Sequence, residues 1–211
     1  SNNTAVGNHA MFANTTGGDN VAVGKEALKG NTTAASNTAV GFQASYTGTT
    51  AERNTSVGYQ ALYSNTGNQS TAVGYQAGRD VTTGLYGTYI GYLAGTNVTT
   101  GSYNVALGRS ALVTNTTGSS NTAIGNEALN ANTTASYNAA LGYQALYDNT
   151  TGGQNTAVGY QALANNTTAA NNAALGNGAL QLNTTGTSNT ATGRQALYAN
   201  TTGSYNTAVG Q

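Results

Sequence analysis

Residues 155–171 read NTAVGYQALANNTTAAN, and the next 17 residues, 172–188, read NAALGNGALQLNTTGTS. The same pattern recurs along the whole chain, with the consensus N-T-A-V-G-Y-Q-A-L-Y-x-N-T-T-G-x-x. When each repeat is numbered from its first Asn, position 5 is a glycine that recurs every 17 residues, except for one step of 16 between Gly58 and Gly74. A fixed period of this length is typical of a solenoid, in which each repeat forms one coil.

The repeat is too short for two helices and two turns, and it contains short β-prone runs (T-A-V, A-L-Y and N-T-T) separated by Gly and Asn. We therefore expect an all-β fold, a parallel β-solenoid of about twelve stacked 17-residue coils in a single repeat domain over residues 1–211. Parallel rungs lie about 4.8 Å apart, so about twelve of them predict a rod roughly 58 Å long.

Side-chain chemistry suggests which positions face inward. Position 4 is Val, Ile or Leu everywhere except at Thr192, and position 9 is usually Leu, so both are predicted to lie in the interior. Position 3 is mostly Ala, as at Ala123 and Ala157. Because neighbouring strand residues point to opposite faces, this Ala file is expected outside, as a smooth stripe against another rod. Ala at position 8, present in every complete coil, is expected where the coil is narrowest.

Glycine and asparagine mark the corners of the predicted coil. Glycine at position 5 suits a corner with positive φ. Asparagine at positions 1 and 12 is expected to stack from coil to coil in amide ladders.

Composition excludes several functions. Only 6% of the residues are charged and the net charge is zero, which gives no electrostatic surface for nucleic acid or an anionic membrane. No apolar stretch approaches the roughly 20 residues of a membrane-spanning helix. The chain has no Cys, so disulfides and thiolate metal sites are excluded. We expect no cofactor, no nucleic-acid partner and no membrane insertion.

Candidate catalytic groups are sparse. His9 is the only histidine, and it lies in the first coil. Glu26 and Glu127 share one row but lie six coils apart, roughly 29 Å, too far for paired carboxylate catalysis. No acid recurs at a fixed position, so the pattern of a calcium-binding β-roll is missing. The sequence predicts no catalytic residue, no metal ligand and no enzyme.

Aromatic residues form rows. One row has an aromatic residue in four consecutive coils, and a second row runs at position 10. A file of stacked rings could be a platform that binds sugars, or a ladder that shields the rod. The candidate ligand-facing aromatics are Phe42, Tyr59, Tyr75 and Tyr92.

The Thr-Thr pair suggests two further hypotheses. An ice-binding face needs two outward Thr files, and adjacent Thr residues point to opposite sides of a strand, so we expect one outward file. N-T-T is also an acceptor sequence for N-linked sugars, although the repeat generates it automatically. The candidate glycosylation sites are Asn14, Asn31, Asn115, Asn132, Asn149, Asn166, Asn183 and Asn200.

The stretch from about residue 65 to 101 departs from the consensus. One residue is missing, Gly78 and Gly95 replace the usual Leu, and Val81 and Val98 replace the usual Asn. Large residues such as Tyr89 stand where small ones are normal. This stretch is either a compensated defect in the stack or a local bulge that binds a partner.

The run N-T-A-V-G, with its variants N-V-A-L-G (104–108) and N-T-A-I-G (121–125), resembles the N-S-V-A-I-G element of YadA-like heads of trimeric autotransporter adhesins. Similar repeats occur in phage tail-fibre and bacterial surface proteins. The resemblance covers the whole chain and implies a left-handed parallel β-roll, three chains side by side, and a role in display or adhesion. The coil here is longer than the head repeat by an N-T-T-G segment.

These observations predict a structural fibre segment, a rigid spacer or display rod of an extracellular appendage, adhesin or phage fibre. The expected location is the cell surface, a secreted filament or a virion fibre. The expected partner is the chain itself, as a side-by-side homotrimer or an end-to-end filament. The alternative is a binding module that recognises glycans through the Tyr rows or ice through the Thr rows.

Overall fold

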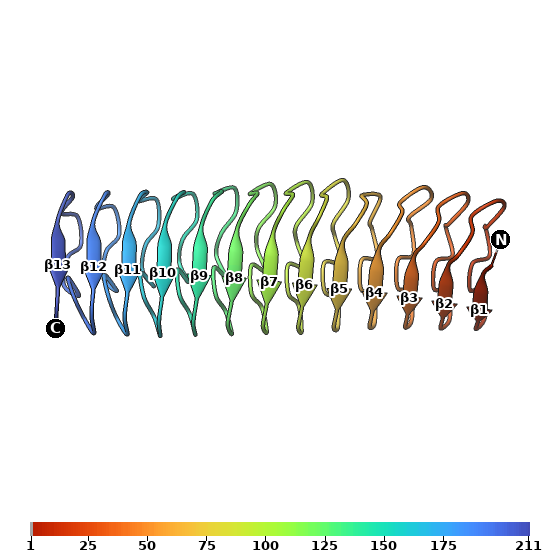
Figure 1. Cartoon of the computed structure of the whole chain (residues 1–211), viewed down its shortest axis with the longest axis horizontal. Coiled ribbons are helices and arrows are strands. Elements are labelled where there is room, and N and C mark those ends of the chain that lie inside the picture. The colour runs from red at the N-terminus through yellow and green to blue at the C-terminus, as the bar shows by residue number, and fades with distance from the viewer. Residues whose placement is uncertain (1) are drawn as a thin grey trace.

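The computed structural model describes residues 2–211, which form one stack of coils (Figure 1). Each coil contributes one strand of three residues, and the 13 strands form a single sheet in sequence order. Every neighbouring pair is parallel, so the predicted parallel β-solenoid is confirmed. The strands are β1 (Thr4–Val6), β2 (Val21–Val23), β3 (Thr38–Val40), β4 (Thr55–Val57), β5 (Thr71–Val73), β6 (Thr88–Ile90), β7 (Val105–Leu107), β8 (Thr122–Ile124), β9 (Ala139–Leu141), β10 (Thr156–Val158), β11 (Ala173–Leu175), β12 (Thr190–Thr192) and β13 (Thr207–Val209).

The register is constant through the shorter coil. Thr55 of β4 pairs with Thr71 of β5, as the same positions pair elsewhere. The carbonyl of Gly67 accepts hydrogen bonds from the side-chain amides of Asn54 (3.0 Å) and Asn65 (2.9 Å), which is the role of position 15 in other coils. The missing residue is therefore the Thr of position 14, and its loss leaves the strand undisturbed.

The inward and outward faces of the strand are the reverse of the expectation. Ala123 and Ala157 at position 3 are fully buried, whereas Leu107 and Leu141 at position 4 are 41% and 46% exposed. The position-3 Ala packs with the Ala of position 8 and the Leu of position 9 in one core cluster. Because that Leu occupies most of the apolar space, only a methyl group fits opposite it.

This reversal removes the Ala stripe as a lateral contact. The prediction that position 4 is interior and position 3 exterior was wrong, while the prediction that the Leu of position 9 is interior is confirmed. A Lys at Ala123 or Ala157 would place a charge in the core, so it would disrupt the coil itself and would not probe an interface.

The runs A-L-Y and N-T-T do not form strands; they form turns and bends. The φ angle is positive at Gln161 (51°), Leu163 (53°) and Asn171 (61°), and at the same positions of other coils. Gln161 donates its N–H to Tyr143 in the preceding coil (2.9 Å), while Leu163 donates to Ala179 in the next coil (3.0 Å). Residues with positive φ thus direct their N–H groups to both neighbouring coils. These hydrogen bonds offset the ~1–2 kcal/mol cost of each left-handed residue.

Glycine at position 5 is required by close approach of the backbones. Gly159 has φ of 131°, and a Cβ on it would lie 2.7 Å from the carbonyl of Gly176 in the next coil. The predicted positive-φ corner is confirmed, and no residue with a side chain fits there.

Two asparagine ladders run through the interior, as predicted. At position 12, Asn149 donates its Nδ2 to the Oδ1 of Asn132 (3.0 Å) and to the carbonyl of Gly152 (2.9 Å). At position 1, Asn155 donates its backbone N–H to the Oδ1 of Asn138 (2.9 Å). These buried amides therefore link consecutive coils and also tie opposite walls of one coil together.

We predict that Asn149→Ala destabilises the chain by about 1–3 kcal/mol, because the buried amide of Asn166 loses its acceptor and the carbonyl of Gly152 loses one of its two donors. Urea unfolding followed by circular dichroism measures the loss. Thr151→Ala, on the exposed side of the same coil, is the control and should change stability by less than about 0.5 kcal/mol. Equal effects of the two changes would show that the ladder does not contribute.

Candidate functional site

Residues 2–211 form no pocket, and they bring no three His, Cys, Asp or Glu side chains together in a cluster that could hold a metal ion. No helix in the same range is long and apolar enough to cross a membrane. The candidate sites in this part of the chain are files of exposed side chains on the rod.

The predicted aromatic row is a continuous stack. The ring centroids of Phe42 and Tyr59 lie 5.2 Å apart, those of Tyr59 and Tyr75 5.1 Å, and those of Tyr75 and Tyr92 5.2 Å. The interplanar angles are 17°, 8° and 13°, so each face is covered by the next ring. The exposed parts of the inner rings are edges and hydroxyl groups. A sugar that packs on an aromatic face finds these faces occupied, which favours the shielding ladder over the sugar platform.

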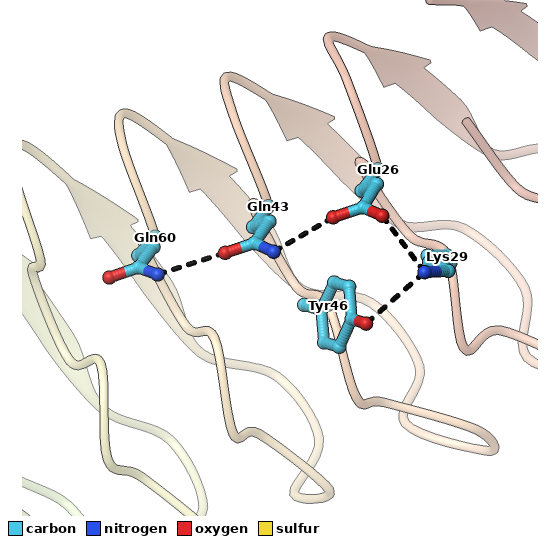
Figure 2. A network of polar contacts seen from close by, with 5 residues as sticks. All are labelled: Glu26, Lys29, Gln43, Tyr46 and Gln60. Carbon is cyan, nitrogen blue, oxygen red and sulfur yellow. Dashed lines mark hydrogen bonds and ion pairs between the residues drawn. The ribbon is translucent and has the colours of Figure 1, made fainter. Parts of the chain in front are cut away.

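A ladder of Gln amides at position 7 of consecutive coils ends on a carboxylate (Figure 2). Gln60 donates its Nε2 to the Oε1 of Gln43 (2.9 Å), and Gln43 donates to Glu26 (2.8 Å). Glu26 also accepts a hydrogen bond from Lys29 (2.9 Å), which in turn donates to the hydroxyl of Tyr46 (3.2 Å). An ionised carboxylate only accepts hydrogen bonds, so Glu26 fixes the direction in which every amide of the ladder points.

The second glutamate of the row has the same role. Glu127 accepts hydrogen bonds from Gln144 (2.9 Å) and from Arg109 (2.8 Å), and Gln161 donates to Gln144 (2.8 Å). Glu26 and Glu127 therefore lie in one row because each ends an amide ladder. The structure gives both residues a structural role at the rod surface.

Hydrogen bonds hold the pKa of both carboxyl groups below the ordinary value of 4.5. The largest cause is the bond from Lys29 for Glu26 and the bond from Gln144 for Glu127. A carboxyl group whose pKa is depressed in the folded state contributes stability above its unfolded pKa, and that stability is lost as the pH falls through the folded pKa.

Glu127→Gln should show this dependence. The variant keeps an acceptor for Gln144 but loses the ion pair with Arg109, so it should be slightly less stable than the parent chain at neutral pH. The difference should shrink as the pH falls below 4.5, because the parent carboxyl group becomes protonated. Urea midpoints of both chains at several pH values measure it. A difference that stays constant or grows on acidification would contradict the assigned hydrogen bonds.

The candidate glycosylation sites lie in the coil interior. Six of the eight asparagines are fully buried, and their Nδ2 groups donate to carbonyls of the same coil. Asn14 and Asn200, in the outer coils, are half-buried and make the same bond. A sugar on Nδ2 would have to replace these bonds within the core, so the folded coil is incompatible with glycosylation at the six positions. These are Asn31, Asn115, Asn132, Asn149, Asn166 and Asn183.

The two Thr files differ. At position 13, Thr133 donates its hydroxyl to the carbonyl of Thr150 in the next coil (3.1 Å). At position 14, Thr134 and Thr151 are exposed. Only one file is fully outward, as expected, and the second outward file that an ice-binding face needs is not supplied by the pair.

The irregular stretch is built around Tyr89. This residue replaces the small residue of position 3 and is fully buried. A Cβ on Gly95 would lie 2.2 Å from its Cδ1, and a Cβ on Gly78 would lie 2.8 Å from its Cδ2. The ring therefore occupies the space of two leucines. Burial raises the pKa of Tyr89, and its hydroxyl has no hydrogen-bond partner.

The sheet passes through this stretch without a bulge. Tyr89 of β6 pairs in register with Ala72 of β5 and Ala106 of β7. This supports the hypothesis of a compensated defect. Sequence reasoning noted the unusual residues but missed that Tyr89 and the two glycines form one unit. The signal was available, because the glycines flank Tyr89 in the two coils whose Leu is missing.

A third aromatic file, at position 17, was also missed. Tyr86 and Tyr103 stack with centroids 5.0 Å apart and are 44% and 60% exposed. The same 17-residue spacing could have identified them.

We predict that Gly95→Leu alone destabilises the chain by about 1–3 kcal/mol through overpacking, and that Tyr89→Ala alone costs about 3–5 kcal/mol through a cavity. The triple variant Tyr89→Ala, Gly78→Leu, Gly95→Leu restores the consensus core and should recover most of the loss. Leu fits these sites, because Leu112 adopts φ of 54° at the same position where Gly95 has 57°. Additive losses in the triple variant would show that the three residues do not share one space.

No protein-family model matches this chain, and no curated protein is similar enough to count as a relative.

Proposed function

We propose that the chain is a rigid spacer or display rod, a segment of an extracellular fibre such as a surface appendage, an adhesin or a phage fibre. The observation that supports this proposal is the recurrence of the same bonds between coils along most of the stack. Each coil is bonded to the next on several sides, and the sheet keeps one register over 13 strands.

Bonds on different sides of the coil resist bending in different directions. In one coil the strand side is held by Thr156 to Asn172 (2.8 Å), and a second side by Leu163 to Ala179 (3.0 Å). A third is held by the N–H of Thr167 to the carbonyl of Thr184 (3.1 Å). Bending the rod in any direction has to stretch at least one of these ladders. A stiff rod with a uniform, weakly charged surface suits a protein that holds something at a fixed distance.

The resemblance to YadA-like heads of trimeric autotransporter adhesins, and to phage tail-fibre repeats, supports the same role and an extracellular location. In this proposal the chain acts without a cofactor or a chemical reaction, and its partner is itself, side by side or end to end. The alternative of a glycan-binding or ice-binding module has less support, because the aromatic faces cover one another and one Thr hydroxyl of most pairs is bonded to the backbone.

Removing whole coils tests the spacer function. Deletion of residues 155–205 removes three coils and joins Gln154 to Asn206 in phase. The variant should stay folded and be shorter by roughly 14 Å, at about 4.8 Å per coil, because each coil adds the same rise. Small-angle X-ray scattering of the two chains gives the difference in maximum dimension. Duplication of the same residues is the control and should lengthen the rod equally.

Two outcomes would contradict the proposal. Loss of folding after an in-phase deletion would show that the coils are not interchangeable spacer units. Binding of a defined glycan by the parent chain, lost when Tyr59, Tyr75 and Tyr92 are changed to Ser, would favour the binding module.

A further inference from the structure

The outer face of the sheet carries no charge. Positions 2 and 4 of every strand point outward, and none of the 13 strands has a charged residue at either position. Large apolar side chains are exposed there, among them Val73 (37%), Leu107 (41%), Leu141 (46%) and Leu175 (42%). Figure 1 shows the strands side by side from one end of the rod to the other, so this outer sheet face is continuous.

Over β8 to β11 the outer sheet face has a relief that alternates from coil to coil. Strands β9 and β11 read AAL, with a small Ala at position 2 beside an exposed Leu at position 4. Strands β8 and β10 read TAI and TAV, with a larger Thr at position 2 beside a half-buried β-branched residue. In β9 and β11 the large Leu at position 4 is thus accompanied by the small Ala at position 2, whereas β7 has Val105 beside Leu107. A uniform partner surface would not match this alternation.

We infer that the outer sheet face is the contact surface for a second copy of this chain, packed sheet against sheet. A second copy has the same rung spacing along the whole length and the same alternation over β8 to β11, so it matches the relief there. A two-fold axis parallel to the rod brings position 4 of one copy over position 2 of the other in the same coil. Leu141 then lies over the partner's Ala139, and Leu175 lies over the partner's Ala173.

The area of the face is sufficient only when the contact runs along the full rod. Thirteen strands at about 4.8 Å span roughly 62 Å, and three residues at about 3.3 Å span roughly 10 Å. Each copy therefore contributes about 600 Å², or about 1,200 Å² in total, at the lower limit of stable interfaces. The absence of charge favours the contact, because no ionised group has to be desolvated. The inference depends on the proposed function in one respect: the rod has to present a straight, unbroken sheet face.

Three substitutions on the face test this inference. Leu107→Lys, Leu141→Lys and Leu175→Lys together place charges on the face in β7, β9 and β11, where the side chains are exposed and the core is untouched. The matched control carries Thr117→Lys, Thr151→Lys and Thr185→Lys, at the exposed position 14 of the same three coils. Sedimentation and light scattering over a concentration series measure association, and circular dichroism checks folding.

The parent chain and the control should be dimers. The dissociation constant of the face variant should be about 100-fold higher, or the variant should be a monomer at every concentration tested. A monomeric parent chain, a three-chain particle, or a face variant that associates like the control would each overturn the inference. The experiment distinguishes a failure of this inference from a failure of the proposed spacer function, because scattering from the monomer reports the length of the rod. A straight rod of full length that stays monomeric contradicts only the dimer, whereas a bent or short monomer contradicts the spacer.

Discussion

A consensus coil closes around an interior that holds one leucine, two alanines and two asparagine side chains. In the coil of β10 these are Leu163, Ala157, Ala162, Asn155 and Asn166, all fully buried. Because this interior space recurs in most coils, it determines which side of the strand can face inward. A larger residue therefore fits only where its own coil and the adjacent coil lack side chains of similar volume, as Gly95 and Gly78 do around Tyr89.

The interior amides explain how so thin a core can hold together. The apolar part of one coil is small, and the buried Asn side chains add bonds between coils and across each coil. A buried amide that is fully bonded stabilises the stack, while a buried amide without partners would cost free energy. The recurrence of Asn at positions 1 and 12 therefore has a structural cause, and the sequence motif for sugar attachment is a by-product of it.

The period, the parallel stack, the asparagine ladders and the alignment of the aromatic rows follow from the sequence, because each depends only on spacing and residue type. The faces of the strand do not. Hydrophobicity ranks Val158 above Ala157, but the inward choice depends on the space left by Leu163 on the opposite wall, which no single strand reveals. The turns at A-L-Y and N-T-T were also missed, because residues such as Leu163 adopt a positive φ that directs their N–H to the next coil, and the sequence of one coil does not reveal that contact.

The side-chain ladders give the rod a direction. Inside, Asn166 donates to Asn149, and outside, Gln161 donates to Gln144, so in both ladders the N–H groups point towards earlier coils and the oxygens towards later ones. A cut through the stack leaves the oxygens of these two ladders on one surface and their N–H groups on the other. A coil inserted upside down would set donor against donor, so coils can be joined in only one orientation. The stack is therefore polar, and each coil can join the preceding coil in one orientation only.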